Sequence, residues 1–476
     1  MTSTRLPAGT SLEALEHAGL PAAEVTGWAS AAPGPDSSFT VAAEAVRGFL
    51  GRGQSLIDRL PGRASGTAGE RAAREIIAAA MNEARDRFLR GHAAELYDTL
   101  TSGCRRPLRL EDLLNEAAAA LPGLVPVAAE LKAESARALP DKEGIEFSQG
   151  LLTAHVLALP RAGRHLVESM LRPTPQALER LPELRAAGTI DLGPVRLTRH
   201  GRAGILELSN PRHLNAEDDT TLGPTECAVD LILLDPDIEV GVIRGGVVRH
   251  QRYPGVRVFG SGLNLTHLYY GRLSFLFFLV RDLAYVSKIY RGIAADVPGA
   301  VTTPGAFGGT EPVIEKLWVA AVERFAVGGA CQLLHVADHV IASRGSRLFL
   351  PARKEGIIPG ASDLRLPRFV GDRAARQAIL SGREWTAGEP DADALCDEVV
   401  PAEDMDTALA ARIAALTDSG LVNAAANRRA IRIGQEPLDA FREYMATFAV
   451  EQARCHLSPA LVRNLEQHWQ ARERSL

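Results

Sequence analysis

Hydrophobic residues recur at helical spacing early in the chain, between residues 41 and 188. The segments Arg71–Leu89, Leu110–Ala120 and Ser148–Met170 combine this period with many Ala, Leu, Glu and Arg residues, which favour helices. Prolines separate the segments, as they do where helices end. The pattern predicts a helical domain over residues 41–188. Its helices are expected to pack or oligomerise, because nothing in them resembles a catalytic cluster.

A different period begins near residue 189. Val195–Thr198 and Gly204–Leu208 alternate between apolar and polar residues like paired strands, Glu226–Leu234 predicts a helix, and Glu239–Arg244 predicts the next strand. Such units continue to about residue 400. The pattern therefore predicts an α/β core over residues 189–400.

The remaining segments differ in composition from this core. Ala408–Leu416 and Phe441–Arg454 predict helices within a C-terminal region, residues 401–476. Residues 1–40 are rich in Ala, Gly, Pro and Ser and predict a flexible N-terminal segment. Residues 294–310 are a Gly- and Pro-rich loop inside the α/β part, and long loops in compact domains are usually functional or disordered.

One apolar run is followed by a pair of glycines. Lys316–Val327 predicts a buried strand, and the glycines let the backbone turn into a helix that begins near Ala330. The first N–H groups of a helix lack partners, and the helix dipole favours negative charge there, so Gly329 is a candidate oxyanion donor. Val256–Leu265 is a second apolar segment with glycines near its end, so Leu263 could offer a second N–H group.

Composition narrows the possible functions. The chain has 476 residues, 46% hydrophobic and 23% charged, which predicts a globular protein of two or three domains. Its net charge of -5 argues against a dedicated nucleic-acid surface. The five cysteines are scattered without CxxC spacing, so neither a disulfide framework nor a zinc site is expected, and a reduced cytoplasm fits. The longest apolar run, Leu273–Val280, is far shorter than the ~20 residues of a membrane span.

The two glycine turns, taken with three further segments, resemble the crotonase superfamily over roughly residues 195–400. The further segments are Asn210–Ala216, Phe349–Gly360 and Leu366–Gly371. The resemblance implies a spiral of strand–strand–helix units that binds acyl-CoA thioesters. It also implies that the N–H groups of Leu263 and Gly329 stabilise the thioester enolate, and that subunits associate as trimers or hexamers through their C-terminal helices.

The sequence departs from the crotonase hydratases at two catalytic positions. Those hydratases use two glutamates as general acid and base, and the matching positions here hold Gln332 and Ala352. Neither side chain can carry a proton to or from water, so hydration is not expected. Glu355 could stand in for them. A glutamate on a lysine-flanked segment is, however, more often a solvated or ion-paired surface group.

One crotonase subfamily matches this pattern: the cofactor-independent dioxygenases that act on 3,5-dihydroxyphenylacetyl-CoA. The likeness includes the long helical N-terminal region and the segments Leu214–Asp218, Val240–Val247, Gly329–Leu334 and Lys354–Ala361. The resemblance implies that O2 attacks the thioester enolate and gives 3,5-dihydroxyphenylglyoxylate and CoA, without metal or flavin. The product supplies the dihydroxyphenylglycine of glycopeptide antibiotics.

The same resemblance assigns roles at the substrate ring. Glu217 and Gln332 match groups that hydrogen-bond the ring hydroxyls, and Arg281 matches the substrate arginine. An ion pair between Arg281 and Asp282, or between Arg281 and another neighbour, is the structural alternative. Two isoleucines are candidates for an apolar O2 pocket, although core packing explains them equally well: Ile357 and Ile358.

A basic, partly aromatic loop is a candidate for contacts with CoA. The loop Gly245–Gly255 holds His250, Arg252 and Tyr253, and Arg212 follows the first pair of strands. Arginine side chains suit phosphate oxygens, and an aromatic ring suits adenine. A solvated loop with scattered charge is an equally good interpretation.

Other functions stay open at this stage. The chain could be another crotonase, such as an enoyl-CoA isomerase or a thioester hydrolase, or a non-catalytic crotonase-like assembly protein. His335 and His339 stand four residues apart, but they lack the glutamate of a zinc protease and straddle a predicted helix end and the next strand, so no metal site is expected. The base that removes the α-proton is not identified.

Overall fold

The computed structural model describes residues 10–34, 38–295, 302–303, 312–418 and 420–476. Contacts divide the chain into two units, Met1–Leu166 with Met445–Pro459 and Val167–Tyr444 with Ala460–Leu476. The boundary near residue 166 lies upstream of the predicted one at 188, because helix α9 (Pro175–Ala187) packs on elements of the sheet.

The first unit is helical, and two of its helices lie where the sequence predicted a flexible segment. Within residues 10–30, α1 and α2 form instead, because the Trp28 ring is buried, stacks on Phe49 at 4.9 Å and donates a hydrogen bond from Nε1 to the Phe49 carbonyl. Residues 1–9 and 35–37 of that predicted segment lie outside the described residues. The helices are α1 Thr10–His17, α2 Ala22–Ser30, α3 Phe39–Asp58, α4 Ala68–Leu100, α5 Leu110–Ala120, α6 Ala128–Ser135, α7 Phe147–Ala158 and α8 Pro160–Met170.

Local sequence explains where these helices begin and end. The Thr67 side chain accepts from the Glu70 N–H while the Glu70 side chain accepts from the Thr67 N–H, a capping box that starts α4. The predicted helix Ser148–Met170 is two helices, α7 and α8, because Pro160 lacks an N–H group and begins the second one.

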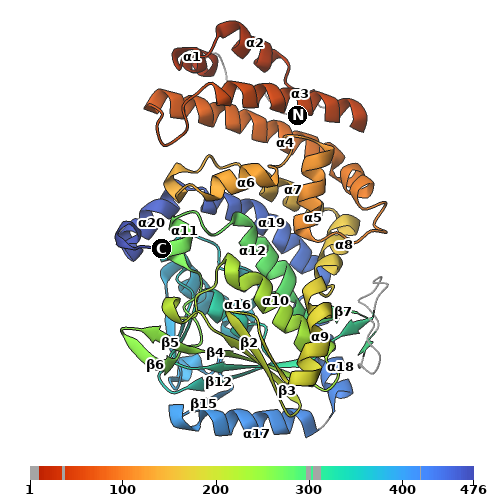
Figure 1. The fold of residues 1–476 in the computed structure, drawn as a ribbon, viewed down its shortest axis with the longest axis vertical. Coiled ribbons are helices and arrows are strands. Elements are labelled where there is room, and N and C mark those ends of the chain that lie inside the picture. The colour runs from red at the N-terminus through yellow and green to blue at the C-terminus, as the bar shows by residue number, and fades with distance from the viewer. Residues whose placement is uncertain (1–9, 35–37, 296–301, 304–311, 419) are drawn as a thin grey trace. The chain divides into compact units, whose positions relative to one another are not determined.

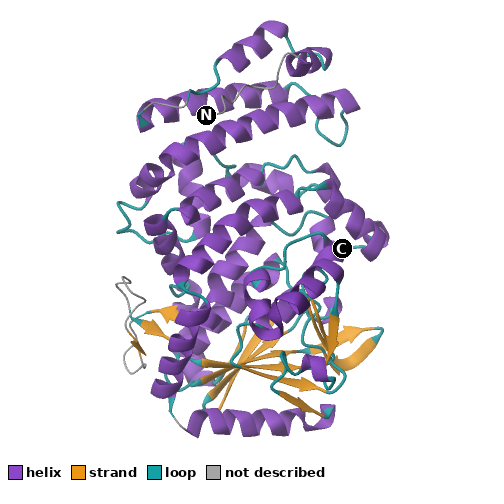
Figure 2. Cartoon of the chain, turned by 180° about the vertical axis from the view of Figure 1, so that it is seen from behind, coloured by secondary structure: helices purple, strands orange, loops and turns teal. Residues whose placement is uncertain are grey.

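The second unit is built on a seven-stranded sheet with the order β1-β2-β3-β4-β10-β12-β15 (Figures 1 and 2). β1, β2 and β3 pair antiparallel, and from β3 to β15 all neighbours are parallel. The predicted α/β core and its first two strands are confirmed. The strands are β1 Thr189–Asp191, β2 Val195–His200, β3 Ala203–Leu208, β4 Val240–Gly245, β10 Leu317–Val322, β12 His339–Ser343 and β15 Glu398–Val400.

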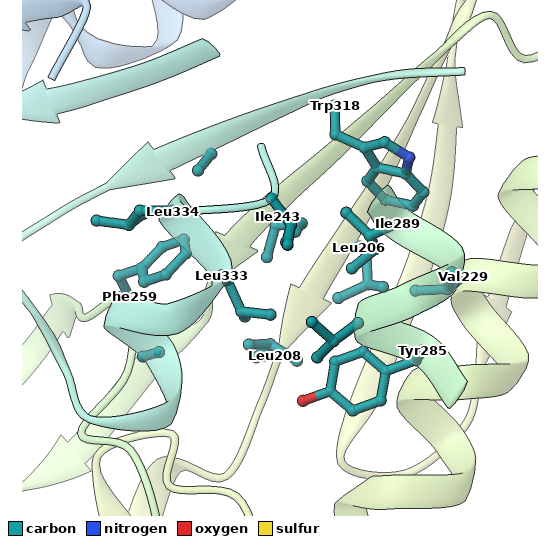
Figure 3. Close-up of a cluster of buried hydrophobic side chains, with 14 of the residues drawn as sticks. Leu206, Leu208, Val229, Ile243, Phe259, Tyr285, Ile289, Trp318, Leu333 and Leu334 are labelled. Atoms are coloured by element: carbon teal, nitrogen blue, oxygen red, sulfur yellow. The ribbon is translucent and has the colours of Figure 1, made fainter. Parts of the chain in front are cut away.

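Apolar side chains cover both faces of this sheet. On one face, α10 (Asp219–Leu234), which links β3 to β4, packs with other helices over a large core (Figure 3). On the other face, α17 (Met405–Asp418) contributes Met405 and Leu409. Because strands covered on both faces are apolar on both faces, β10 reads as a continuous apolar run. Gly241 of β4 is required here, since a Cβ atom would lie 2.4 Å from the Trp318 ring.

Three predicted elements differ from the structure. The run Lys316–Val327 is two strands in different sheets, because Arg324 turns the backbone at φ 67° between β10 and β11 (Phe325–Val327). β11 pairs with β13 (Arg347–Phe349), which pairs with β14 (Glu384–Thr386). The predicted loop Gly245–Gly255 is a hairpin of β5 and β6, Val247–His250 and Tyr253–Arg257. Only the first residues of the predicted strand Val256–Leu265 belong to β6.

The remaining elements complete the fold. The predicted helices Ala408–Leu416 and Phe441–Arg454 are confirmed within α17 and α19. Residues 296–301 and 304–311 of the predicted loop 294–310 lie outside the described residues. None of the described helices is both long and apolar enough to cross a membrane. The elements are α11 Leu265–Tyr269, α12 Phe275–Arg281, the π-helix η3 Asp282–Val286, α13 Ser287–Arg291, α14 Gly329–Leu334, α15 Ala352–Glu355, α16 Ser362–Arg376, α18 Leu421–Gln435, α19 Leu438–His456, α20 Pro459–Trp469 and the short strands β7 Ile293–Ala294, β8 Thr302–Thr303 and β9 Val313–Ile314.

Candidate active site

Two backbone segments approach each other closely where the glycine turns were predicted. The Val327 N–H donates to the Gly260 carbonyl at 3.1 Å, and the Gly260 N–H donates to the Phe325 carbonyl at 3.3 Å. Gly262 adopts φ 79°, and a Cβ atom there would lie 2.6 Å from the Val327 oxygen and 3.1 Å from the Gly329 nitrogen. Only glycine therefore fits at position 262.

The two predicted oxyanion donors lie on either side of this close approach. Leu263 follows Gly262, and Gly329 begins α14 directly after β11. The Gly328 N–H is used by the Phe349 carbonyl at 3.0 Å. Within the described residues, the N–H groups of Leu263 and Gly329 donate to no acceptor. Both residues line one pocket.

The structure brings the two donors together with the predicted ring-binding and O2-binding residues in this one pocket. The predicted residues that line it are Glu217, Leu263, Arg281, Gly329, Gln332, Ile357 and Ile358. They come from segments far apart in the sequence, and the parallel bridge between Glu217 and Leu263 joins two of these segments. Phe277 and Phe278 of α12 contribute aromatic side chains to the wall of the pocket.

Arg281 connects three of these groups. Its Nε and Nη2 atoms lie 3.1 and 3.0 Å from the Glu217 carboxylate, its Nη1 donates to Gln332 Oε1 at 2.8 Å, and its Nη2 donates to the Gly329 carbonyl at 2.7 Å. The ion pair that stood as the structural alternative does form, with Glu217 rather than with Asp282. Charge-assisted bonds of this kind fix orientation, so Arg281 holds the acidic group, the amide and the glycine turn in one arrangement.

The π-helix that follows α12 adds a second donor to Glu217. The Tyr285 hydroxyl donates to the Glu217 carboxylate, and the Arg281 guanidinium lies 5.4 Å from the Tyr285 ring centroid. Burial raises the pKa of Tyr285 well above 10, so the hydroxyl stays a donor. Burial alone would lower the pKa of Arg281, but the Glu217 carboxylate raises it above its ordinary value. π-helical turns are frequent at functional sites.

Glu355 is not the solvated or ion-paired surface group that the sequence suggested. It ends α15, lines the pocket and is only 9% exposed. No hydrogen bond or ion pair of its carboxylate occurs among the described residues, and burial raises its pKa to about 7. The sequence-based expectation was wrong because α15 turns this side chain inward while Arg353 and Lys354 of the same helix stay exposed.

The pocket holds an amide and a methyl group at the positions where crotonase hydratases carry their two glutamates. Gln332 of α14 and Ala352 of α15 both line it. Gln332 accepts its hydrogen bond from Arg281, and a Cβ atom on Gly360 would lie 2.5 Å from Gln332 Oε1, so the amide is tightly confined. Neither Gln332 nor Ala352 can transfer a proton as a glutamate at its position would.

The residues predicted to contact CoA are not among those that line this pocket. Arg212 is exposed in a short 3₁₀ turn, Pro211–His213, next to β5. His250, Arg252 and Tyr253 sit at the tip of the β5–β6 hairpin, with the Arg252 guanidinium 5.7 Å from the Tyr253 ring centroid. The Tyr253 ring packs edge-on against Phe325 at 5.6 Å, which places the hairpin beside β11 and its turn into α14.

The two histidines considered for a metal do not share a helix face. α14 ends at Leu334 and β12 begins at His339, as the sequence predicted. The His335 ring is buried and hydrogen-bonded to Ser362 Oγ at 3.0 Å, and burial lowers its pKa to about 3. Over the described ranges of the chain, no group of three or more His, Cys, Asp or Glu side chains could hold a metal ion.

Sequence reasoning gave no site role to Tyr285 or to Asp282. Tyr285 and Asp282 belong to the π-helix, and their contacts reach Glu217 and the Ala361 N–H. The only available signal was the spacing of Arg281 and Tyr285, four residues apart on an apolar helix. That spacing is equally typical of core packing.

Comparisons with known proteins show which proteins this chain is similar to. Residues 312–443 match the enoyl-CoA hydratase/isomerase family. The (3,5-dihydroxyphenyl)acetyl-CoA 1,2-dioxygenase of Amycolatopsis orientalis is 46% identical over 403 residues, 84% of this chain and 90% of that protein. A probable enoyl-CoA hydratase of Mycobacterium bovis is 29% identical over 235 residues, 49% of this chain and 77% of that protein. The crystal structure of an enoyl-CoA hydratase from Mycobacterium avium subsp. paratuberculosis aligns with a TM-score of 0.46 and 19% identity, covering 60% of this chain and 99% of its own.

Proposed function

The chain belongs to the crotonase (enoyl-CoA hydratase/isomerase) superfamily, in the family of the (3,5-dihydroxyphenyl)acetyl-CoA 1,2-dioxygenase, and we propose that it catalyses the same reaction. It converts 3,5-dihydroxyphenylacetyl-CoA and O2 into 3,5-dihydroxyphenylglyoxylate and CoA. It is therefore an oxidoreductase that acts on an arylacetyl-CoA thioester.

The first step is formation of an enolate. The thioester oxygen accepts hydrogen bonds from the N–H groups of Leu263 and Gly329. Negative charge develops on this oxygen as the α-proton leaves. Removal of one such donor costs about 3–4 kcal/mol in comparable acyl chemistry. The adjacent aryl ring delocalises the same charge.

The ring hydroxyls are recognised at the cluster around Arg281. Glu217, Arg281 and Gln332 line the pocket next to Gly329, so a ring whose carbonyl lies at the two N–H groups reaches them. A carboxylate that accepts a hydrogen bond from a phenol raises the electron density of the ring. The dihydroxylated carbanion is then reducing enough to transfer an electron to O2.

The oxidation itself needs no metal or organic cofactor in this proposal. The carbanion transfers an electron to O2, and the carbon–oxygen bond that forms gives an α-peroxide. The peroxide attacks the thioester carbonyl and expels CoA, and O–O cleavage gives the keto acid. Ile357 and Ile358 would supply an apolar region for O2 beside the carbanion.

The observation that carries this proposal is the composition of one pocket. It keeps two free backbone donors but holds Gln332 and Ala352 in place of the hydratase glutamates. An enolate formed there lacks the two glutamates with which the hydratases add water.

An oxygen electrode tests the proposal. Chelator-treated protein with 3,5-dihydroxyphenylacetyl-CoA should consume one O2 for each CoA released, and CoA release should stop under argon. A thioester hydrolase would release CoA without O2, an isomerase would release none, and a non-catalytic assembly protein would turn over no thioester. Any of these three results would contradict the proposal.

The proposal also covers the association of subunits, the residues that contact CoA and the cellular location of the protein. The subunits associate through the C-terminal helices as trimers, or as hexamers of paired trimers. Arg212, His250, Arg252 and Tyr253 contact the CoA moiety, since the hairpin that carries three of them lies beside β11. A cytoplasmic location agrees with a CoA thioester substrate.

A further inference from the structure

This inference rests on the proposed function and concerns the base that the reaction requires. An arylacetyl thioester, ArCH2C(O)SCoA, plus O2 gives ArC(O)COOH plus HSCoA. The carbon next to the thioester carbonyl therefore loses both of its hydrogens. At least one protein group should accept a proton from that carbon, and the two positions that supply carboxylates in hydratases hold Gln332 and Ala352.

Three carboxyl groups line the pocket, and two of them are already engaged. Glu217 accepts hydrogen bonds from Arg281 and Tyr285. Asp282 Oδ1 accepts from the Ala361 N–H at 3.2 Å, and its other oxygen would lie 2.6 Å from a Cβ atom on Gly360, against the pocket floor. The carboxylate of Glu355 makes no hydrogen bond or ion pair in the part of the chain that the structure describes.

The position of Glu355 suits proton transfer from a bound thioester. Its Oε1 atom lies 3.9 Å from the point where a Cβ atom on Gly328 would stand, so the carboxylate faces the turn that carries the Gly329 N–H group. Ile357 and Ile358 follow it in the chain and line the same pocket. The backbone is held at the end of α15, where Gly356 adopts a left-handed conformation and its N–H donates to the Ala352 carbonyl at 2.7 Å.

We propose that Glu355 is the catalytic base that removes the α-proton of the bound thioester. Its carboxylate takes the proton, and the electrons of the broken C–H bond form the carbon–carbon double bond of the enolate. The carbonyl π electrons move to the thioester oxygen, beside the N–H groups of Leu263 and Gly329. The resulting Glu355 carboxylic acid can return its proton to the CoA thiolate when that group leaves, which frees the carboxylate for the second α-proton.

The surroundings of Glu355 favour this role at neutral pH. Burial raises its pKa to about 7, close to the value at which a base is both deprotonated and basic enough. Burial is the cause of this shift. The charged or titratable groups on the surrounding elements are Glu217, Arg281 and Asp282 across the pocket, Arg353 and Lys354 on the same helix, and Glu384 and His468 on the neighbouring surface.

Anaerobic hydrogen exchange tests this role separately from oxidation. The protein is incubated under argon in D2O with 3,5-dihydroxyphenylacetyl-CoA, and deuterium entering the α-carbon is measured by mass spectrometry. The wild type should exchange the α-hydrogens, and Glu355→Gln should lose on the order of 10²-fold or more of the rate. Glu355→Asp should retain more activity than Glu355→Gln, because it keeps a carboxylate. Glu389→Gln makes the same change at an exposed position and should exchange like the wild type.

The pH dependence gives a second readout. The wild-type exchange rate should rise as pH increases through about 7 and then level off, and Glu355→Gln should lose this rise. Wild-type exchange in the folded Glu355→Gln variant would overturn the inference.

The two proposals fail in different ways. A wild type that exchanges but consumes no O2 contradicts the dioxygenase function, and the comparison of Glu355 variants still decides the identity of the base. A wild type that does not exchange overturns the base assignment, and O2 consumption then decides the proposed function alone.

Discussion

At the scale of single residues, the site is defined by which polar groups have partners. Glu217 has two donors from one helix, whereas Glu355 has none among the described residues. A buried charge without a partner destabilises the folded state, and such groups concentrate at functional sites. Stability and activity are therefore linked at Glu355.

Glu355 should make the protein less stable as pH rises. Its pKa is raised from 4.5 to about 7, so the folded state binds this proton more tightly than the unfolded chain does. Stability should fall between pH 4.5 and 7, by about 3 kcal/mol for this group. Relative to the wild type, Glu355→Gln should gain about that much between pH 4 and pH 8, as measured by urea unfolding. A difference between the two proteins that does not change with pH would contradict the buried, unpaired carboxyl.

Tyr285 should act by positioning Glu217. Tyr285→Phe removes a hydrogen bond to a carboxylate, which is worth about 1.5–3 kcal/mol, so kcat/KM for the dihydroxylated substrate should fall about tenfold or more. The loss should be much smaller for phenylacetyl-CoA in anaerobic exchange, because that ring has no hydroxyl to recognise. Tyr270→Phe, whose hydroxyl bonds the Arg474 carbonyl away from the pocket, is the control. Equal losses for both substrates would point to a general packing effect.

At the scale of elements, the turn between β11 and α14 can lie against Glu217 only because Gly329 has no side chain there. A Cβ atom on Gly329 would lie 2.2 Å from Glu217 Oε2 and 3.3 Å from Arg281 Nη2. The glycine therefore serves the packing of the ring-binding cluster as well as the exposure of its own N–H group.

Gly329→Ala should lose activity while the protein stays folded. The added methyl group displaces Glu217 and the donor turn together, so kcat should fall on the order of 10²-fold or more. Gly223→Ala, in α10 where no atom beyond the neighbouring helix backbone lies within 4 Å of the new methyl group, should keep full activity. Steady-state O2 uptake and circular dichroism check both variants. Wild-type activity in Gly329→Ala would contradict the observed packing.

At the scale of the whole molecule, a cluster of buried arginines binds the residue that follows α18 to other helices of the same unit. Glu436 follows α18. Its carboxylate accepts hydrogen bonds from the guanidinium groups of three arginines, with nitrogen–oxygen distances of 3.0 Å for Arg365, 2.9 Å for Arg368 and 2.6 Å for Arg291. Burial would raise the pKa of Glu436, but these three arginines lower it to about 2. This network joins α13, α16 and the segment after α18, which are far apart in the sequence.

Glu436→Gln should destabilise the protein in a pH-dependent way. Because the folded-state pKa lies below 4.5, the carboxylate contributes its stability fully above that pH and loses it as pH falls toward 2. Breaking a buried pair typically costs about 3–5 kcal/mol. Thermal melts of the two proteins should differ widely at pH 7, and the difference should shrink as pH falls from 4.5 toward 2. The surface pair Arg376–Asp372 offers a control, since Asp372→Asn should change stability little.

The sequence alone determined the features that depend on neighbouring residues. The period of apolar residues predicted the α/β core and many of its helices, and the glycine pair after an apolar run predicted the turn into α14. These follow from local backbone preferences and from side-chain chemistry, which a linear sequence contains.

Only the tertiary structure decided which side chains meet and which are shielded from water. Tyr285 reaches Glu217 across 68 positions of sequence, the predicted CoA loop folded into a hairpin outside the pocket wall, and Glu355 turned inward from a helix whose neighbouring residues are exposed. The protonation and contacts of a group depend on the atoms packed around it, and those atoms come from distant segments. For that reason the most consequential carboxyl group of the site looked, in the sequence, like an ordinary surface charge.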